Sequence, residues 1–192
     1  MPILHFITHP EVVIDPSVPV PDWPLSPEGV RRMGLALEQH WISQWGSVFS
    51  SAERKAMDAA QLVAGRLGLS PVAVSQLGEN DRSAAGYLPK TEFEATADTF
   101  FAHPQESVRE WERAVDAQRR ISAAVERVIA EAPRSGDVAV VSRGGVGALL
   151  LCHLKGVPIS RAEDQPSAGG GCVYSFDTST RALLSGWRLI EG

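Results

Sequence analysis

The sequence has few cysteines, no long apolar run and no excess of basic residues. Its 192 residues include 2 cysteines, Cys152 and Cys172, without metal-binding spacing, so we expect buried thiols and not a disulfide or a metal site. No window holds about 18 consecutive apolar residues, which argues against a membrane partner. The formal net charge is -5, and this acidic balance argues against a nucleic-acid partner.

The amino-terminal residues also lack the pattern of a secretion signal. Residues 1–8 enter an apolar, strand-like run directly, without a basic start and a longer apolar stretch, so we expect a cytoplasmic protein. Hydrophobic residues make up 44% of the chain and charged residues 21%, which is typical of a globular domain. No internal repeat or long linker divides the chain, and residues 1–192 are expected to form a single domain.

Short apolar segments of strand type alternate along the chain with segments of helical type. Strands are expected at residues 3–8, 48–50, 72–74, 137–142, 173–176 and 182–189. Helices are expected at residues 53–67, 91–101 and 106–131, after Ser26-Pro27, and from Gly144 to about residue 155. The alternation predicts an α/β fold, a three-layer α/β/α sandwich with a mostly parallel central sheet.

Two of the expected strands end in residues that can carry chemistry. In open α/β sheets, ligands bind beyond the carboxyl ends of the strands. The first strand ends at Thr8-His9 and the strand at 137–142 ends at Ser142-Arg143, so both ends are expected to face one pocket. Five prolines between residues 16 and 27 make the intervening segment a loop, which we expect to shape that pocket together with residues 79–90.

His9 is the candidate nucleophile of this pocket. A neutral imidazole attacks phosphorus readily and forms a phosphoramidate. A lone histidine at a strand end is more often structural, so the assignment depends on the surrounding segments.

Two further segments place cations at expected helix starts. Arg54 and Lys55 lie in a first helical turn, where they oppose the helix dipole unless an anion binds there. Arg143 precedes Gly144-Gly145, and a guanidinium beside free helix amides can hold phosphate oxygens. The structural alternatives are a solvated helix start and a tight turn with a surface arginine.

Taken in order, these segments resemble the motifs of the histidine phosphatase superfamily, which includes the phosphoglycerate mutases. The family's Arg-His-Gly-Glu is matched by Thr8-His9-Pro10-Glu11, and its Ser-Pro-x-x-Arg-Ala by Ser51-Ala52-Glu53-Arg54-Lys55-Ala56. Its Pro-Leu-Ser-x-x-Gly, Leu-x-Glu, Glu-Ser and Ser-His-Gly-Gly are matched by residues 24–29, 77–79, 106–107 and 142–145.

The resemblance implies a phosphomonoester hydrolase that acts through a phosphohistidine. His9 would be the nucleophile and Glu79 the acid that protonates the leaving oxygen. The phosphate would be held by Thr8, Arg54, Lys55, Arg143 and Gly144. The ligand would be a small phosphorylated molecule or phosphate, with no prosthetic cofactor and no metal. The sequence leaves open whether the protein forms a homodimer.

The chain also departs from the family pattern in the pocket. Thr8 and Lys55 stand where the family has arginines, Pro10 replaces a glycine and Arg143 replaces the second histidine. The positive charge available to a phosphate is therefore about the same as in the family's pocket, but it comes from different positions. We therefore expect a weak or specialised phosphatase, with a non-catalytic phosphate- or phospho-ligand-binding protein on the same fold as the alternative.

Three other interpretations have less support. Gly145-Val146-Gly147 lacks the third glycine of a dinucleotide-binding motif. A metal site of His5, His9 and Glu11 lacks a further ligand. Asp164-Gln165 and residues 169–171 would form either a mobile lid over the pocket or, as we favour, a plain surface loop.

Overall fold

The computed structural model describes residues 2–166 and 169–192, and within them six strands form one sheet. The strands are β1 (Ile3–Thr8), β2 (Trp45–Ser50), β3 (Val72–Ala73), β4 (Asp137–Ser142), β5 (Cys172–Asp177) and β6 (Leu183–Leu189). Their order is β3-β2-β4-β1-β5-β6, and β1, β2, β3 and β4 are parallel, whereas β5 is antiparallel to both of its neighbours. The expected mostly parallel sheet is confirmed.

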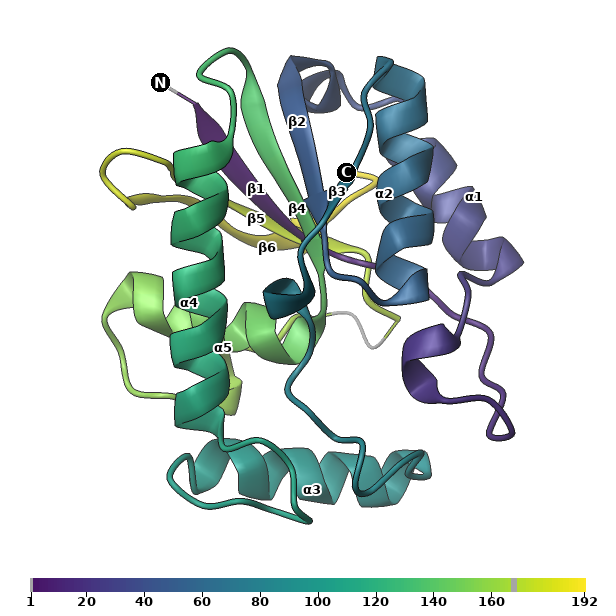
Figure 1. Ribbon diagram of the computed structural model, residues 1–192, viewed down its shortest axis with the longest axis vertical. Helices are drawn as coiled ribbons and strands as arrows, with labels where there is room; N and C mark the ends of the chain where they lie inside the picture. Colours follow the sequence, from purple (N-terminus) through teal and green to yellow (C-terminus); the bar gives the residue numbers. More distant parts are fainter. Residues whose placement is uncertain (1, 167–168) are drawn as a thin grey trace.

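Helices cover both faces of this sheet (Figure 1). Helices α1 (Pro27–Ala36) and α2 (Arg54–Leu67) lie on one face, and α4 (Ala114–Glu131) and α5 (Gly144–Lys155) lie on the other. Helix α3 (Lys90–Ala102) crosses the end of the molecule toward which β2 and β4 run. The three-layer α/β/α sandwich predicted from the sequence is therefore present. No helix in the described part of the chain is long and apolar enough to cross a membrane.

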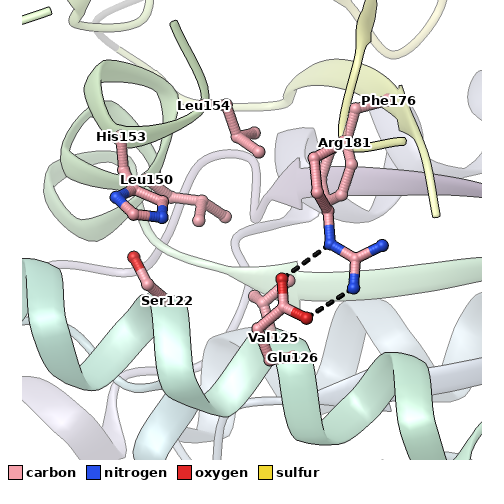
Figure 2. Close-up of a pocket in the computed structure, with 8 residues that line it drawn as sticks. All are labelled: Ser122, Val125, Glu126, Leu150, His153, Leu154, Phe176 and Arg181. Atoms are coloured by element: carbon pink, nitrogen blue, oxygen red, sulfur yellow. Dashed lines mark hydrogen bonds and ion pairs between the residues drawn. The ribbon is translucent and has the colours of Figure 1, made fainter. Parts of the chain in front are cut away.

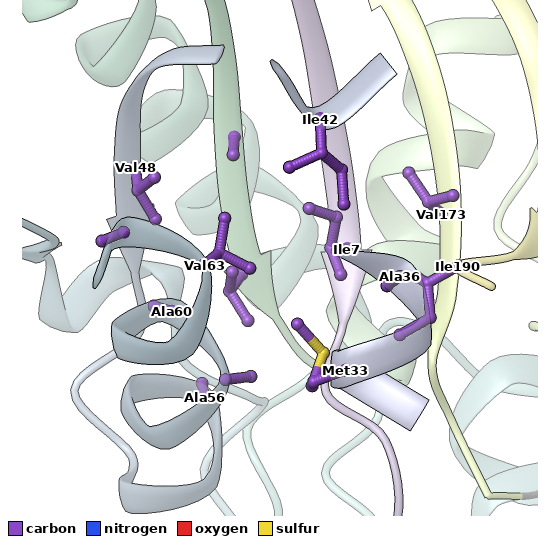
Figure 3. Packing of buried hydrophobic residues seen from close by; sticks show 14 of the residues in the cluster. Ile7, Met33, Ala36, Ile42, Val48, Ala56, Ala60, Val63, Val173 and Ile190 are labelled. Carbon is purple, nitrogen blue, oxygen red and sulfur yellow. The ribbon is translucent and has the colours of Figure 1, made fainter. Parts of the chain in front are cut away.

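Alternation along β1 supplies both halves of the core. Successive strand residues point to opposite faces, so Ile7 packs with Met33 and Val63 under α1 and α2, as Figure 3 shows. Phe6 points the other way and stacks on Tyr174 at a centroid distance of 5.2 Å, in the cluster beneath α4 and α5. Ala56 and Ala60 of α2 are fully buried, and these small side chains let the helix lie close to the sheet.

Local sequence explains how α1 begins. Pro27 is at its first position, and the Ser26 side chain accepts a hydrogen bond from the Gly29 amide at 3.1 Å. A Cβ on Gly29 would lie 2.2 Å from the Glu11 carbonyl oxygen, so a side chain here would push α1 away from the segment after β1. This close approach is a physical reason for glycine at the end of the motif at residues 24–29.

The helix expected at residues 106–131 is shorter than predicted and begins only at Ala114. Arg109 and Glu110 have φ angles of 50° and 60°, which no α-helix contains. The Ser107 hydroxyl donates to the Trp111 carbonyl at 2.7 Å, and the Trp111 ring packs against Phe100. Burial of Trp111 beneath α3 therefore overrides the helical pattern.

Candidate functional site

The ends of β1 and β4 bring His9 and Arg143 to the same edge of the sheet, as the sequence predicted. Thr8 pairs with Ser142 in the parallel register, and the His9 amide donates to the Ser142 carbonyl at 3.2 Å. The Ser51 amide, which follows β2, donates to Val141 of β4 at 2.9 Å. Three segments distant in sequence therefore meet beyond the carboxyl ends of adjacent strands.

The His9 ring is held in the form that a nucleophile needs. Its Nδ1 lies 2.8 Å from the Pro10 carbonyl oxygen, and because a carbonyl only accepts, Nδ1 donates and Nε2 keeps its lone pair. Burial, followed by the charge of Arg143, lowers the pKa of His9 to about 3. His9 is therefore neutral at physiological pH.

The Glu79 carboxylate caps the amino terminus of α5. Its Oε2 accepts from the Gly145 amide at 3.2 Å and its Oε1 from the Val146 amide at 2.9 Å. Burial raises the Glu79 pKa, but Arg82, Arg143 and these amides together outweigh burial and lower it. Glu79 is therefore ionised at neutral pH in this structure.

Lys55 links the site to the proline-rich loop. Its side chain is only 1% exposed, donates through Nζ to the Val20 carbonyl and lies 5.4 Å from the centre of the Trp23 ring. Burial, followed by repulsion from Arg143, lowers the pKa of Lys55 to about 7. Lys55 therefore carries only part of its positive charge at neutral pH.

Arg143 is held between two carboxylates. Its Nη1 donates to Glu53 Oε1 at 2.7 Å, and its Nε lies 3.6 Å from Glu79 Oε2. The side chains of Arg143 and Glu53 are 15% and 14% exposed, so this is a largely buried ion pair. An anion that reaches the guanidinium therefore competes with Glu53.

The other predicted phosphate-binding residues differ in their placement. The Thr8 hydroxyl donates to Gln165 Oε1 at 2.6 Å, and a Cβ on Gly144 would lie 2.5 Å from Gln165 Nε2. Thr8 thus binds Gln165, and Gly144 leaves room for the Gln165 side chain. Residues 167 and 168 of the same loop lie outside the described residues. The Arg54 side chain is exposed and makes no hydrogen bond or ion pair within the described part of the chain, so the structure does not bring it into the site.

Two charged residues of the site were missed from the sequence, Arg82 and Glu53. The Arg82 guanidinium lies 3.3 Å from Glu79 Oε2 and 4.5 Å from the centre of the Trp111 ring. It is a third cation of the cluster that includes Arg143 and Lys55. Arg82 lies in a polar loop without a pattern that marks it, and Glu53 occupies an unspecified position of its motif, so no sequence feature indicated their roles.

The metal and dinucleotide alternatives find no support in the geometry. His5 contacts Ser175 Oγ at 2.8 Å and Glu11 contacts Arg32, so neither turns toward His9. Within the described residues, no three His, Cys, Asp or Glu side chains gather as a metal site would require. A Cβ on Gly147 would lie 2.9 Å from the Phe6 ring, so this glycine serves helix packing.

A separate cavity of about 110 Å³ lies between α4, α5 and β5 (Figure 2). Its lining includes Ser122, His153 and the ion pair of Glu126 with Arg181. None of the residues of the candidate site lines it.

The fold and the site define a class: an α/β protein with a neutral histidine and a cluster of cations beyond the carboxyl edge of a parallel sheet. The family model described as the histidine phosphatase superfamily (branch 1) matches residues 16–184. The chain belongs to this superfamily. The matched range begins after His9 and includes Lys55, Glu79 and Arg143.

Solved structures of phosphatases share the fold. The mycobacterial glucosyl-3-phosphoglycerate phosphatase, in complex with inorganic phosphate, superposes with a TM-score of 0.75 at 20% identity over 100% of both chains. The phosphoserine phosphatase of Entamoeba histolytica, in complex with 3-phosphoglyceric acid, gives a TM-score of 0.78 at 14% identity over 100% of this chain and 99% of that one. No curated protein matches the sequence.

Proposed function

We propose that the protein is a phosphomonoester hydrolase that acts through a phosphohistidine on His9. The observation that carries the proposal is the neutral His9 ring, whose Nδ1 is fixed by the Pro10 carbonyl so that Nε2 is free to attack. Arg143 and Lys55 act on His9 electrostatically, and Arg82 joins the same cluster through Glu79, so the site holds a source of positive charge. Two structural neighbours carry phosphatase names, which supports the same class of reaction here.

The reaction would proceed in two steps. His9 Nε2 forms a bond to phosphorus while the bond to the leaving alkoxide oxygen breaks, and that oxygen takes up a proton. Water then attacks the phosphohistidine and releases inorganic phosphate and a neutral His9. Arg143, Arg82 and Lys55 would stabilise the non-bridging oxygens, and this stabilisation is the largest contribution that a protein makes to phosphoryl transfer.

Glu79 is the proposed proton donor, although it is ionised in this structure. A phosphate dianion beside Arg82 and Arg143 would offset the two charges that lower the Glu79 pKa. The carboxyl would then take up a proton as substrate binds and would deliver it to the leaving oxygen. Ligand binding and proton uptake are therefore expected to be coupled.

The direct test is turnover of an aryl phosphate, together with trapping of the intermediate. A substrate labelled with ³²P should leave a protein-bound label that is lost in acid and kept in alkali, as a phosphoramidate is. A label that is stable in acid would contradict a histidine intermediate.

The alternative is a phosphate- or phospho-ligand-binding protein without turnover. The pairing of Arg143 with Glu53 favours it, because a carboxylate already lies against the guanidinium that a substrate would use. An inactive natural protein that gains turnover when Arg143→His restores the family residue would establish the alternative. Activity in the natural protein would exclude it.

The pKa of Lys55 predicts how anion affinity depends on pH. Lys55 is fully charged only below pH 7, so affinity for sulfate is expected to fall as pH rises from 7 to 9, by up to about tenfold for each pH unit. Sulfate is the suitable probe, because its own charge is constant over this range. Calorimetric titration at several pH values measures the effect, and Lys55→Met should give weak binding that does not change with pH. Equal slopes in both proteins would contradict this origin.

The remaining features of the proposal concern the setting of the reaction. We propose a small phosphorylated molecule as substrate, without prosthetic cofactor or nucleic-acid partner, and a single domain of residues 1–192 in the cytoplasm. A homodimer is compatible with this scheme, and light scattering of the purified protein would determine the oligomeric state.

A further inference from the structure

Glu53 has an unusual position for a residue at the start of a helix. It is the N-cap residue of α2, yet its side chain makes no capping hydrogen bond to its own helix. The carboxylate turns instead to Arg143, 90 residues away, while its Oε2 lies 3.4 Å from Ser51 Oγ and 3.5 Å from the Glu79 amide. Glu53 thus occupies a donor of the Arg143 guanidinium with a carboxylate.

The cations of the site already have carboxylate partners before any ligand binds. Arg82, Arg143 and the partly charged Lys55 supply the positive charge, and the Glu53 and Glu79 carboxylates lie beside these cations. A phosphomonoester dianion adds two negative charges. If it takes over Arg143 and has no positive group of its own, it removes the arginine partner of the Glu53 carboxylate, which is largely buried.

We infer that Glu53 makes the site selective for phosphomonoesters that carry an ammonium group within a few atoms of the phosphate. This inference rests on the proposed function. The phosphate of such a ligand takes over Arg143, and its ammonium group pairs with the Glu53 carboxylate that Arg143 releases. One ion pair within the protein is thereby exchanged for two with the ligand. A dianion without the ammonium group breaks the same internal pair and gives Glu53 no new partner in return. A polar site discriminates against an analogue in this way.

Two ligands of equal size separate charge from shape. Phosphoethanolamine and propyl phosphate differ in that an ammonium group of the first is a methyl group in the second. Binding is measured by calorimetric titration into the His9→Ala protein, because neither ligand can then be consumed. We expect phosphoethanolamine to bind at least about tenfold more tightly, since an unpaired buried charge costs more than 1.4 kcal/mol.

The Glu53→Gln variant tests the residue itself. It is expected to remove the preference, chiefly by tightening the binding of propyl phosphate. Glu126→Gln is the matched control, because Glu126 also pairs with an arginine, Arg181, but lines the separate cavity of Figure 2. It should leave the preference unchanged.

Each outcome bears on the inference. Equal affinity for the two ligands in the protein that retains Glu53 overturns it, and this comparison does not depend on the folding of any Glu53 variant. A Glu53→Gln protein that binds both ligands more tightly by the same factor also overturns it, because Glu53 then only competes with phosphate. If neither ester nor inorganic phosphate binds, the proposed function fails together with the inference. Binding without preference overturns the inference alone.

Discussion

Replacing His9 with alanine is expected to reduce the turnover of an aryl phosphate at least about 10³-fold. The substitution removes the only imidazole among the residues that we place in the site, so no phosphoenzyme can form. The cations Arg143, Arg82 and Lys55 are untouched, and the dissociation constant for inorganic phosphate should change by no more than about threefold. Steady-state rates and phosphate titration measure the two effects separately.

The pH profile of the natural protein gives an independent check on His9. Because burial and Arg143 lower its pKa to about 3, His9 is neutral from pH 5 upward, and its protonation should not limit the rate between pH 5 and 8.

His103→Ala is the matched control for the His9→Ala substitution, because the His103 ring is exposed and lies beside Glu106. Full activity in pure His9→Ala protein would exclude the phosphohistidine scheme.

Replacing Arg32 with alanine is expected to destabilise the fold by about 3 kcal/mol. The side chain is 4% exposed and contacts Glu11, Glu191 and the carbonyls of Gly170 and Gly171. Its loss leaves the two carboxylates without their arginine partner and removes one donor from each of the two carbonyls. The melting temperature should therefore fall by about 6–12 °C, which differential scanning calorimetry measures.

The neighbouring arginine provides the control for this prediction. Arg31 is exposed and pairs with Glu28 one turn earlier, so Arg31→Ala should leave the melting temperature almost unchanged. Arg32 also supports the site indirectly. It holds Gly170, where a Cβ would lie 2.2 Å from the His9 carbonyl oxygen, against the segment that carries the candidate nucleophile. Equal melting temperatures for the two variants would contradict the role of the Arg32 contacts.

The local features of the fold followed from the sequence because neighbouring residues produce them. Ser26 and Pro27 begin α1, and Gly68 ends α2 with a φ of 68°, as residues of these types do in many helices. Cys152 and Cys172 are both buried, as expected for thiols that behave as small apolar groups. The prediction of a helix in the residues before Ala114 was wrong, because the burial of Trp111 depends on α3 and not on the neighbours of Trp111 in sequence.

The sequence by itself determined the α/β class, the superfamily and the positions of His9, Lys55 and Arg143, because strand alternation and ordered motifs are properties of the chain. Only the tertiary structure decided which charges meet. Glu79 caps a helix that begins 65 residues later, Glu53 pairs with Arg143 across 90 residues, and Arg82 enters the site from a loop without a motif. Such pairs form where strand order and helix placement bring side chains together. No local sequence pattern encodes which residues distant in the chain become neighbours in space.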